Sequence, residues 1–121
     1  MDKAKPNLSI EFRGQVVVAT LTDEKILDEN QLIRLENSFM PLIAQTPHIQ
    51  LIVDFSNVQF LTSAVLGLLI RVSKKVYETE GKLRLCAIDA KIMDIFRITR
   101  LDKIFEIFPD IDDAMIGLKR N

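Results

Sequence analysis

Two neighbouring hydroxyl residues, Thr62 and Ser63, stand where a short polar loop gives way to a helical pattern. The first backbone N–H groups of a helix lack intrahelical partners, and the helix dipole places about half a positive charge there. A phosphate on Ser63 would add about −1.5 to −2 charges, so modification at this position would act as an electrostatic switch. The structural alternative is that Ser63 or Thr62 only caps the helix, because both residue types are common N-caps.

The residues after Ser63 separate into two faces when they are wound at 100° per residue. The predicted core face contains Val65, Leu66, Leu69, Val72, Ser73 and Val76, and the opposite face contains Ala64, Gly67, Arg71, Lys74, Lys75 and Glu78. The small residues Ala64 and Gly67 would admit the backbone of a partner protein. Tight packing against a neighbouring loop explains Gly67 equally well. The basic residues also fit an ordinary solvated face.

The residue types of the chain indicate neither a catalytic site nor a metal site. The single histidine, His48, precedes the predicted strand whose far end leads to Ser63, so it cannot act as a base beside that serine. One histidine and one cysteine, Cys86, cannot form a zinc site, and four glycines form no phosphate-binding loop. Cys86 is predicted to be a buried thiol. We therefore expect a protein that is not an enzyme and holds no metal or cofactor.

Size and charge narrow the class of protein further. The 121 residues, 48% of them hydrophobic, predict a single domain over residues 8–118 with tails at 1–7 and 119–121. The net charge of −1 favours no nucleic-acid partner. The longest uncharged apolar run, Val65–Ile70, is far shorter than the ~20 residues that span a bilayer. We expect a cytoplasmic protein that does not insert into membranes and is a monomer or weak dimer.

The elements that must position Ser63 begin with a hairpin. Leu8–Phe12 and Val16–Leu21 are predicted strands that turn at Gly14, the first of them at a sheet edge. Asp28 is predicted to cap a helix, with Gln31 completing a capping box.

Pro41 predicts a kink or an early end of that first helix. From Ile49 onward, strands alternate with helices. The predicted elements are strand Ile49–Phe55, helix Ser63–Glu80, strand Leu83–Ile88, a helix from Asp89 or Ala90 with Ile92, Ile95 and Phe96 on one side, strand Ile104–Phe108, and a helix capped by Asp110. This alternation predicts an α/β fold, in which the hairpin and parallel βαβ units form a mixed sheet with about four helices packed on it. Sites in such folds lie at the carboxyl ends of strands, where Ser63 is expected.

Residues 53–63 carry a more specific pattern, a hydrophobic strand followed by Asp54, Ser56, an aromatic residue and the helix-start serine. This pattern resembles the signature of STAS domains of the anti-sigma-factor antagonist family. Segments 81–88 and 95–105 are similar to the next strand, the third helix and the final strand of that family. The resemblance extends over the chain from Leu8 onward. The sequence departs from the family pattern at Thr62, where an acidic residue is usual, and at Val65, where a glycine is usual.

The resemblance implies a binding module that is regulated by phosphorylation. When unphosphorylated, such a protein sequesters an anti-sigma factor with a kinase fold, which phosphorylates the serine that matches Ser63, and a phosphatase reverses the modification. ATP and magnesium would be bound by the partner kinase. The implied partner-binding residues are Asp23, Asp28, Thr62, Ser63, Ala64, Gly67 and Arg71. From the residues alone, Asp23 and Asp28 also fit a solvated loop and a helix cap.

The two departures from the family pattern keep a second interpretation open. Thr62 is the second candidate for phosphorylation, since stressosome-type relatives use threonines. Other STAS proteins act without phosphorylation, as scaffold subunits of stressosome-like or ABC lipid-transport complexes.

Overall fold

The computed structural model describes residues 7–118, which form a mixed five-stranded sheet with helices on both faces. The strands are β1 (Leu8–Arg13), β2 (Val16–Leu21), β4 (Gln50–Asp54), β6 (Lys82–Cys86) and β7 (Glu106–Phe108), in the spatial order β1-β2-β4-β6-β7. The β1–β2 pair is antiparallel and the other pairs are parallel. The predicted mixed sheet is confirmed, and so is the position of the first strand at its edge.

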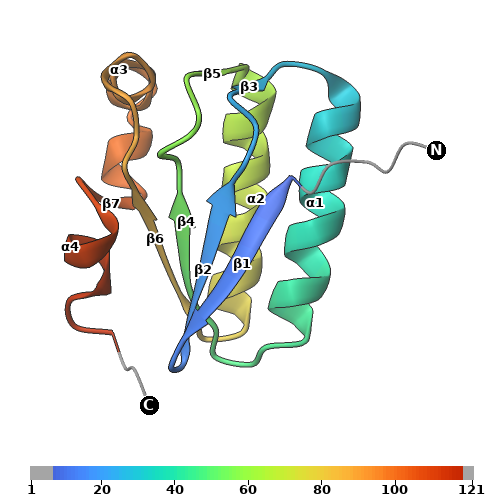
Figure 1. Cartoon of the computed structure of the whole chain (residues 1–121), viewed down its shortest axis with the longest axis vertical. Helices are drawn as coiled ribbons and strands as arrows, with labels where there is room; N and C mark the ends of the chain where they lie inside the picture. Colours follow the sequence, from blue (N-terminus) through green and yellow to red (C-terminus); the bar gives the residue numbers. More distant parts are fainter. Residues whose placement is uncertain (1–6, 119–121) are drawn as a thin grey trace.

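Three helices cover one face of this sheet, and a short fourth helix covers the other (Figure 1). They are α1 (Glu29–Ala44), α2 (Ser63–Glu78), α3 (Ala90–Ile98) and, on the opposite face, α4 (Ile111–Met115). The larger core lies between the sheet and α1 to α3 and includes Phe39, Phe55 and Phe96, which are fully buried. α1 and α2 lie side by side, so the starts of both helices reach the carboxyl edge of the sheet.

The start of α1 follows the predicted capping box. Asp28 accepts a hydrogen bond from the backbone N–H of Gln31 at 2.8 Å, and the Gln31 side chain accepts one from the backbone N–H of Asp28 at 3.1 Å. The early end predicted at Pro41 is wrong, because α1 continues to Ala44. Burial of Phe39 and Ile43 on either side of Pro41 stabilises this last turn against the loss of one helical hydrogen bond.

The smaller core, on the other face, depends on one basic side chain. Arg84 of β6 donates hydrogen bonds to the carbonyl oxygens of Ala114 and Ile116 at the end of α4 and to Glu106 of β7 at 3.0 Å. Its guanidinium also lies 5.0 Å from the centre of the Phe108 ring. A cation satisfies carbonyl groups at a helix end well, so Arg84 holds α4 against the sheet.

Several predicted boundaries differ from the structure. α2 ends at Glu78 because Glu80 has a left-handed backbone (φ 62°) that turns the chain into β6. The last strand begins at Glu106, since a 3-10 helix, Leu101–Lys103, precedes it and leaves Ile104 exposed. Ile95 is also exposed, because only Ile92 and Phe96 of the predicted side face the core.

The predicted tails lie largely outside the described residues. Asn7, which the prediction placed in the first tail, is buried, and its side chain accepts a hydrogen bond from Ser38 at 3.2 Å. Within residues 7–118, no helix has the length and apolar character needed to cross a membrane.

Candidate functional site

A second, very small sheet organises the carboxyl edge of the main one. Its strands are β3 (Lys25–Ile26) and β5 (Phe60–Leu61), which pair in parallel. The carbonyl of Glu24 accepts hydrogen bonds from Gln59 at 2.8 Å and Phe60 at 3.2 Å, and Thr62 donates its N–H to Ile26 at 3.3 Å. The sequence predicted loops at both segments. This sheet joins the segment before α1 to the segment before α2.

Ser63 is the first residue of α2, and its side chain is exposed. Thr62 occupies the N-cap position with an extended backbone (φ −95°, ψ 167°), but its hydroxyl makes no capping hydrogen bond. The first turn of α2 contains no acidic residue, whereas the last turn contains Lys75. The positive end of the helix dipole is therefore not balanced by an acidic side chain of its own first turn.

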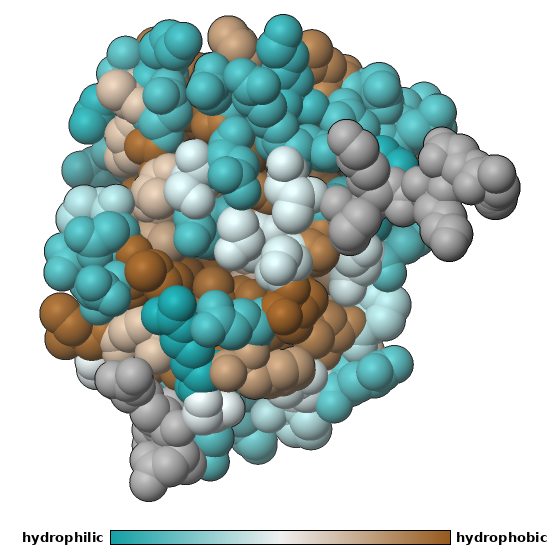
Figure 2. All heavy atoms as spheres, in the orientation of Figure 1, coloured by the Kyte–Doolittle hydropathy of each residue, from teal (hydrophilic) through white to brown (hydrophobic). Residues whose placement is uncertain are grey.

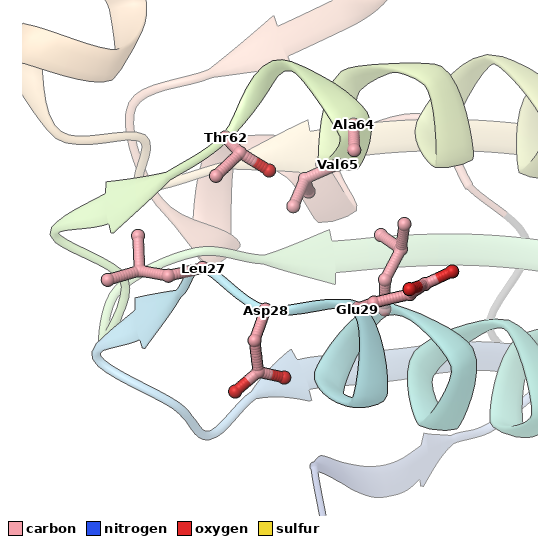
Figure 3. A pocket seen from close by; sticks show the side chains of 7 residues that line it. Leu27, Asp28, Glu29, Thr62, Ala64 and Val65 are labelled. Carbon is pink, nitrogen blue, oxygen red and sulfur yellow. The ribbon is translucent and has the colours of Figure 1, made fainter.

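A hollow of about 300 Å³ lies between the starts of α1 and α2 (Figure 3). It is lined by Leu27, Asp28, Glu29, Leu32, Thr62, Ala64 and Val65. Three of the predicted partner-binding residues, Asp28, Thr62 and Ala64, therefore share one concave surface. Ser63 is exposed but is not among the residues that line the hollow.

Gly67 lies one turn further along α2, and no packing contact requires a glycine there. A β-carbon at Gly67 would meet only the guanidinium of Arg71, at 3.8 Å. The alternative that Gly67 serves tight packing against a neighbouring loop is therefore wrong. By contrast, a β-carbon at Gly81 would collide with the backbone of Ile49, so Gly81 is required by the fold.

The two acidic residues of the predicted set both bond to Gln31 in the first turn of α1. Asp28 caps α1, and Asp23 accepts a hydrogen bond from the Gln31 side chain at 3.2 Å. Arg71, the basic member of the set, pairs with Glu36 of α1 at 3.2 Å, and both side chains are about half exposed. The structure thus brings Asp28 to the hollow, while Asp23 and Arg71 lie outside it.

Leu27 and Phe60 were not among the predicted site residues, although both are large, apolar and exposed beside the start of α2 (54% and 42%). Two lysine ammonium groups lie over the Phe60 ring, Lys25 at 5.5 Å and Lys91 at 4.9 Å from its centre. Leu27 precedes the cap Asp28 and Leu32 follows it by four residues, which is the spacing of a hydrophobic staple. This spacing could have predicted Leu27 from the sequence. The lysines over Phe60 could not be predicted in this way, because they come from separate elements.

Neither of the two residues considered for other chemistry lines the hollow. Cys86 ends β6 but belongs to the smaller core on the other face of the sheet. His48 is in the turn before β4, with a left-handed backbone (φ 58°), at the opposite end of that strand. Cys86 is fully buried, and burial, with smaller contributions from Asp54 and Asp110, raises the pKa of its thiol to about 12. The predicted buried thiol is confirmed.

Comparisons with known proteins agree with this geometry. The STAS domain family model matches residues 7–114. A STAS domain protein of Planctomyces limnophilus, described as an anti-sigma-factor antagonist, has a TM-score of 0.83 at 18% identity, over 91% of this chain and 96% of its own. An anti-sigma factor antagonist from Mycobacterium paratuberculosis is 28% identical, with a TM-score of 0.78 and 89% of both chains covered.

A third similar structure is the phosphorylated form of the Bacillus cell fate determinant SpoIIAA. It has a TM-score of 0.69 at 16% identity, over 90% of this chain and 96% of its own. The similarity of fold and the match to the family model therefore cover nearly all of the described residues. The chain belongs to the STAS domain family.

Proposed function

We propose that this chain is an anti-sigma-factor antagonist, and that phosphorylation of Ser63 ends its binding to an anti-sigma factor with serine kinase activity. The observation that carries the proposal is the exposed Ser63 hydroxyl on the uncapped first turn of α2. The Mycobacterium relative is an anti-sigma factor antagonist, and SpoIIAA, which has a similar fold, has been solved in a phosphorylated form. Both facts support the assignment.

The surface around Ser63 suits a protein partner. Ala64 and Gly67 place no large side chain on the surface of α2 near Ser63, and the hollow between α1 and α2 offers the apolar side chains of Leu27 and Leu32. A phosphate on Ser63 adds about −1.5 to −2 charges to this surface. The added charge and bulk would weaken a complex that had formed around a neutral hydroxyl.

In this proposal the chain is a substrate and a binding module in the cytoplasm, and the catalytic groups belong to its partners. The kinase binds ATP and Mg²⁺ and transfers the terminal phosphoryl group to the Ser63 oxygen, with release of ADP and the hydroxyl proton. A phosphatase then hydrolyses the phosphate ester with water. Asp23 and Arg71 would contact the partner at the rim of the surface.

Exposure and charge make Ser63 a better acceptor than Thr62. Thr62 is only partly exposed and lines the hollow, whose other side carries the carboxylates of Asp28 and Glu29. A phosphate on Thr62 would add negative charge to a hollow that already contains these two carboxylates. A phosphate on Ser63 would stand on an exposed residue that does not line this hollow.

The direct test is phosphorylation by a serine kinase encoded in the same operon neighbourhood. Intact-mass measurement should give one phosphate per wild-type chain, none for Ser63→Ala, and one for the matched control Thr62→Ala. Ser63→Asp should weaken kinase binding about tenfold or more, while Ser63→Ala should bind like the wild type. Absence of phosphate on every residue in the presence of an active, binding kinase would overturn the proposal.

The second candidate function is a scaffold subunit of a stressosome-like or ABC lipid-transport complex. It is favoured by Thr62 and Val65, which replace the residues usual beside a phosphorylated serine. Equal binding of Ser63→Ala and Ser63→Asp to such a complex, purified from cells, would support this function over the first.

A further inference from the structure

The outer edge of β1 has no neighbouring strand among residues 7–118. β1 is the first strand in the sheet order and pairs only with β2. Its six residues pair one-to-one with β2 and contain no bulge, proline or lysine. Bulges, prolines and lysines normally keep edge strands from pairing with other chains. This edge is therefore a regular template for another strand.

The turn at the end of β1 determines which backbone groups are free. Arg13 and Val16 face each other across a two-residue turn, so these two residues form a hydrogen-bonded pair. Pairs in an antiparallel ladder alternate between hydrogen-bonded and non-hydrogen-bonded types. Glu11 therefore bonds to β2, whereas Ile10 and Phe12 direct their N–H and C=O groups outward.

The side chains of the same two residues are apolar and exposed. Ile10 is 40% exposed and Phe12 is 65% exposed, although their β2 partners Ala19 and Val17 are buried in the main core. Helix α1 thus leaves this edge uncovered. Phe12 also lines a hollow of about 400 Å³ with Val17 and other residues near the sheet end. Figure 2 looks onto the opposite face of the sheet, where apolar and hydrophilic surface lie side by side over the lower part of the molecule.

The opposite face of β1 carries one acidic and one basic side chain. Glu11 and Arg13 lie two residues apart on that face and pair at 3.1 Å. In an antiparallel pair of two copies centred on Phe12, Glu11 of each copy stands opposite Arg13 of the other. A pair centred on Glu11 would instead place two carboxylates opposite each other, which destabilises a sheet. Charge complementarity selects the register centred on Phe12.

We propose that β1 is a homodimerisation edge, at which a second copy of this chain adds its own β1 antiparallel about a two-fold axis at Phe12. The two Phe12 residues exchange both backbone hydrogen bonds, and the two five-stranded sheets become one. An interface of one strand pair lies below about 1,200 Å², the range of weak, reversible complexes. The β1–β2 turn after Phe12 lies at the amino end of β4, whereas α2, which begins at Ser63, starts beyond the carboxyl end of β4 (Figure 1). Both copies therefore keep an accessible Ser63.

Sedimentation equilibrium between about 10 µM and about 1 mM tests the association. The wild type should shift from monomer to dimer within this range. Glu11→Arg should weaken the dimer about tenfold or more, because each Arg13 then faces an arginine. The charge-swapped double variant Glu11→Arg/Arg13→Glu should restore association to within about threefold of the wild type.

Two further variants test the backbone pair. Phe12→Pro removes the outward N–H without touching the β1–β2 ladder, so it should be folded by circular dichroism and monomeric. Ile104→Ala changes an exposed residue of similar accessibility away from this edge and should dimerise like the wild type. If Phe12→Pro fails to fold, Glu11→Arg and the charge-swapped double variant still test the proposed dimer. A wild type that stays monomeric at about 1 mM, or a double variant no better than Glu11→Arg, would overturn the proposal.

Discussion

Replacement of Gly67 by alanine should raise stability and lower partner affinity at the same time. The added β-carbon would meet one atom of Arg71 at 3.8 Å, which is an ordinary van der Waals distance. Alanine is favoured over glycine within a helix by about 0.5–1 kcal/mol. Because nothing in the structure opposes the methyl group, the free energy of unfolding should rise by about that amount.

The expected shift is measurable by denaturation. For a chain of this length the entropy of unfolding is about 0.25 kcal/mol/K, so Tm should rise by about 2–4 °C. In urea, the midpoint should rise while the dependence of the unfolding free energy on denaturant stays constant. Binding to the anti-sigma kinase that we propose as the partner should weaken about tenfold, since the methyl group would stand on the surface where Ala64 and Gly67 place no large side chain.

Gly81→Ala is the matched control, because its β-carbon would collide with the Ile49 backbone. We expect that variant to lose about 1–3 kcal/mol of unfolding free energy. A loss of stability in Gly67→Ala would refute the conclusion that Gly67 is free of packing constraints. Higher stability with unchanged affinity would instead place the partner elsewhere on the molecule.

Three other predictions concern a helix cap, the attachment of α4 and the buried thiol. Asp28→Ala should lower the free energy of unfolding by about 1 kcal/mol in urea, because it removes the cap of α1; an unchanged midpoint would contradict the capping role. Arg84→Ala should cost about 2–3 kcal/mol and speed amide exchange in α4, whose end carbonyls it satisfies; unchanged exchange there would contradict this. The Cys86 thiol has a pKa of about 12 when folded and 9.0 as its ordinary value. Above pH 9 the unfolded chain therefore binds fewer protons, and stability should fall as pH rises, by up to about 1.4 kcal/mol per pH unit. Cys86→Ala should flatten this dependence relative to the wild type, and identical profiles would refute the assignment.

Periodicity and capping residues predicted most of the fold. The hairpin, the Asp28 capping box and the core face of α2 follow from local spacing, and the structure confirms them. Ser63 was correctly expected at a helix start beyond a strand end, since that placement follows from the alternation of strands and helices. Its role in phosphorylation and partner binding remains a prediction.

The features that escaped prediction depend on contacts between distant segments. The strands β3 and β5 contain two residues each, too few to show a period, and they form because Glu24 and Ile26 accept hydrogen bonds from residues more than thirty positions later. The continuation of α1 past Pro41 likewise follows from burial of Ile43, which outweighs the local preference of proline. Rules that use only neighbouring residues predict neither the β3–β5 pairing nor the burial of Ile43.

The small β3–β5 sheet has a thermodynamic consequence for recognition. Loops at the edge of a sheet usually lose conformational entropy when a partner orders them. Here hydrogen bonds from Gln59, Phe60 and Thr62 already hold both loops together before any partner arrives. The proposed partner would therefore meet a preorganised surface. Association should then resemble the docking of two rigid bodies, with a heat-capacity change that reflects the buried apolar area alone.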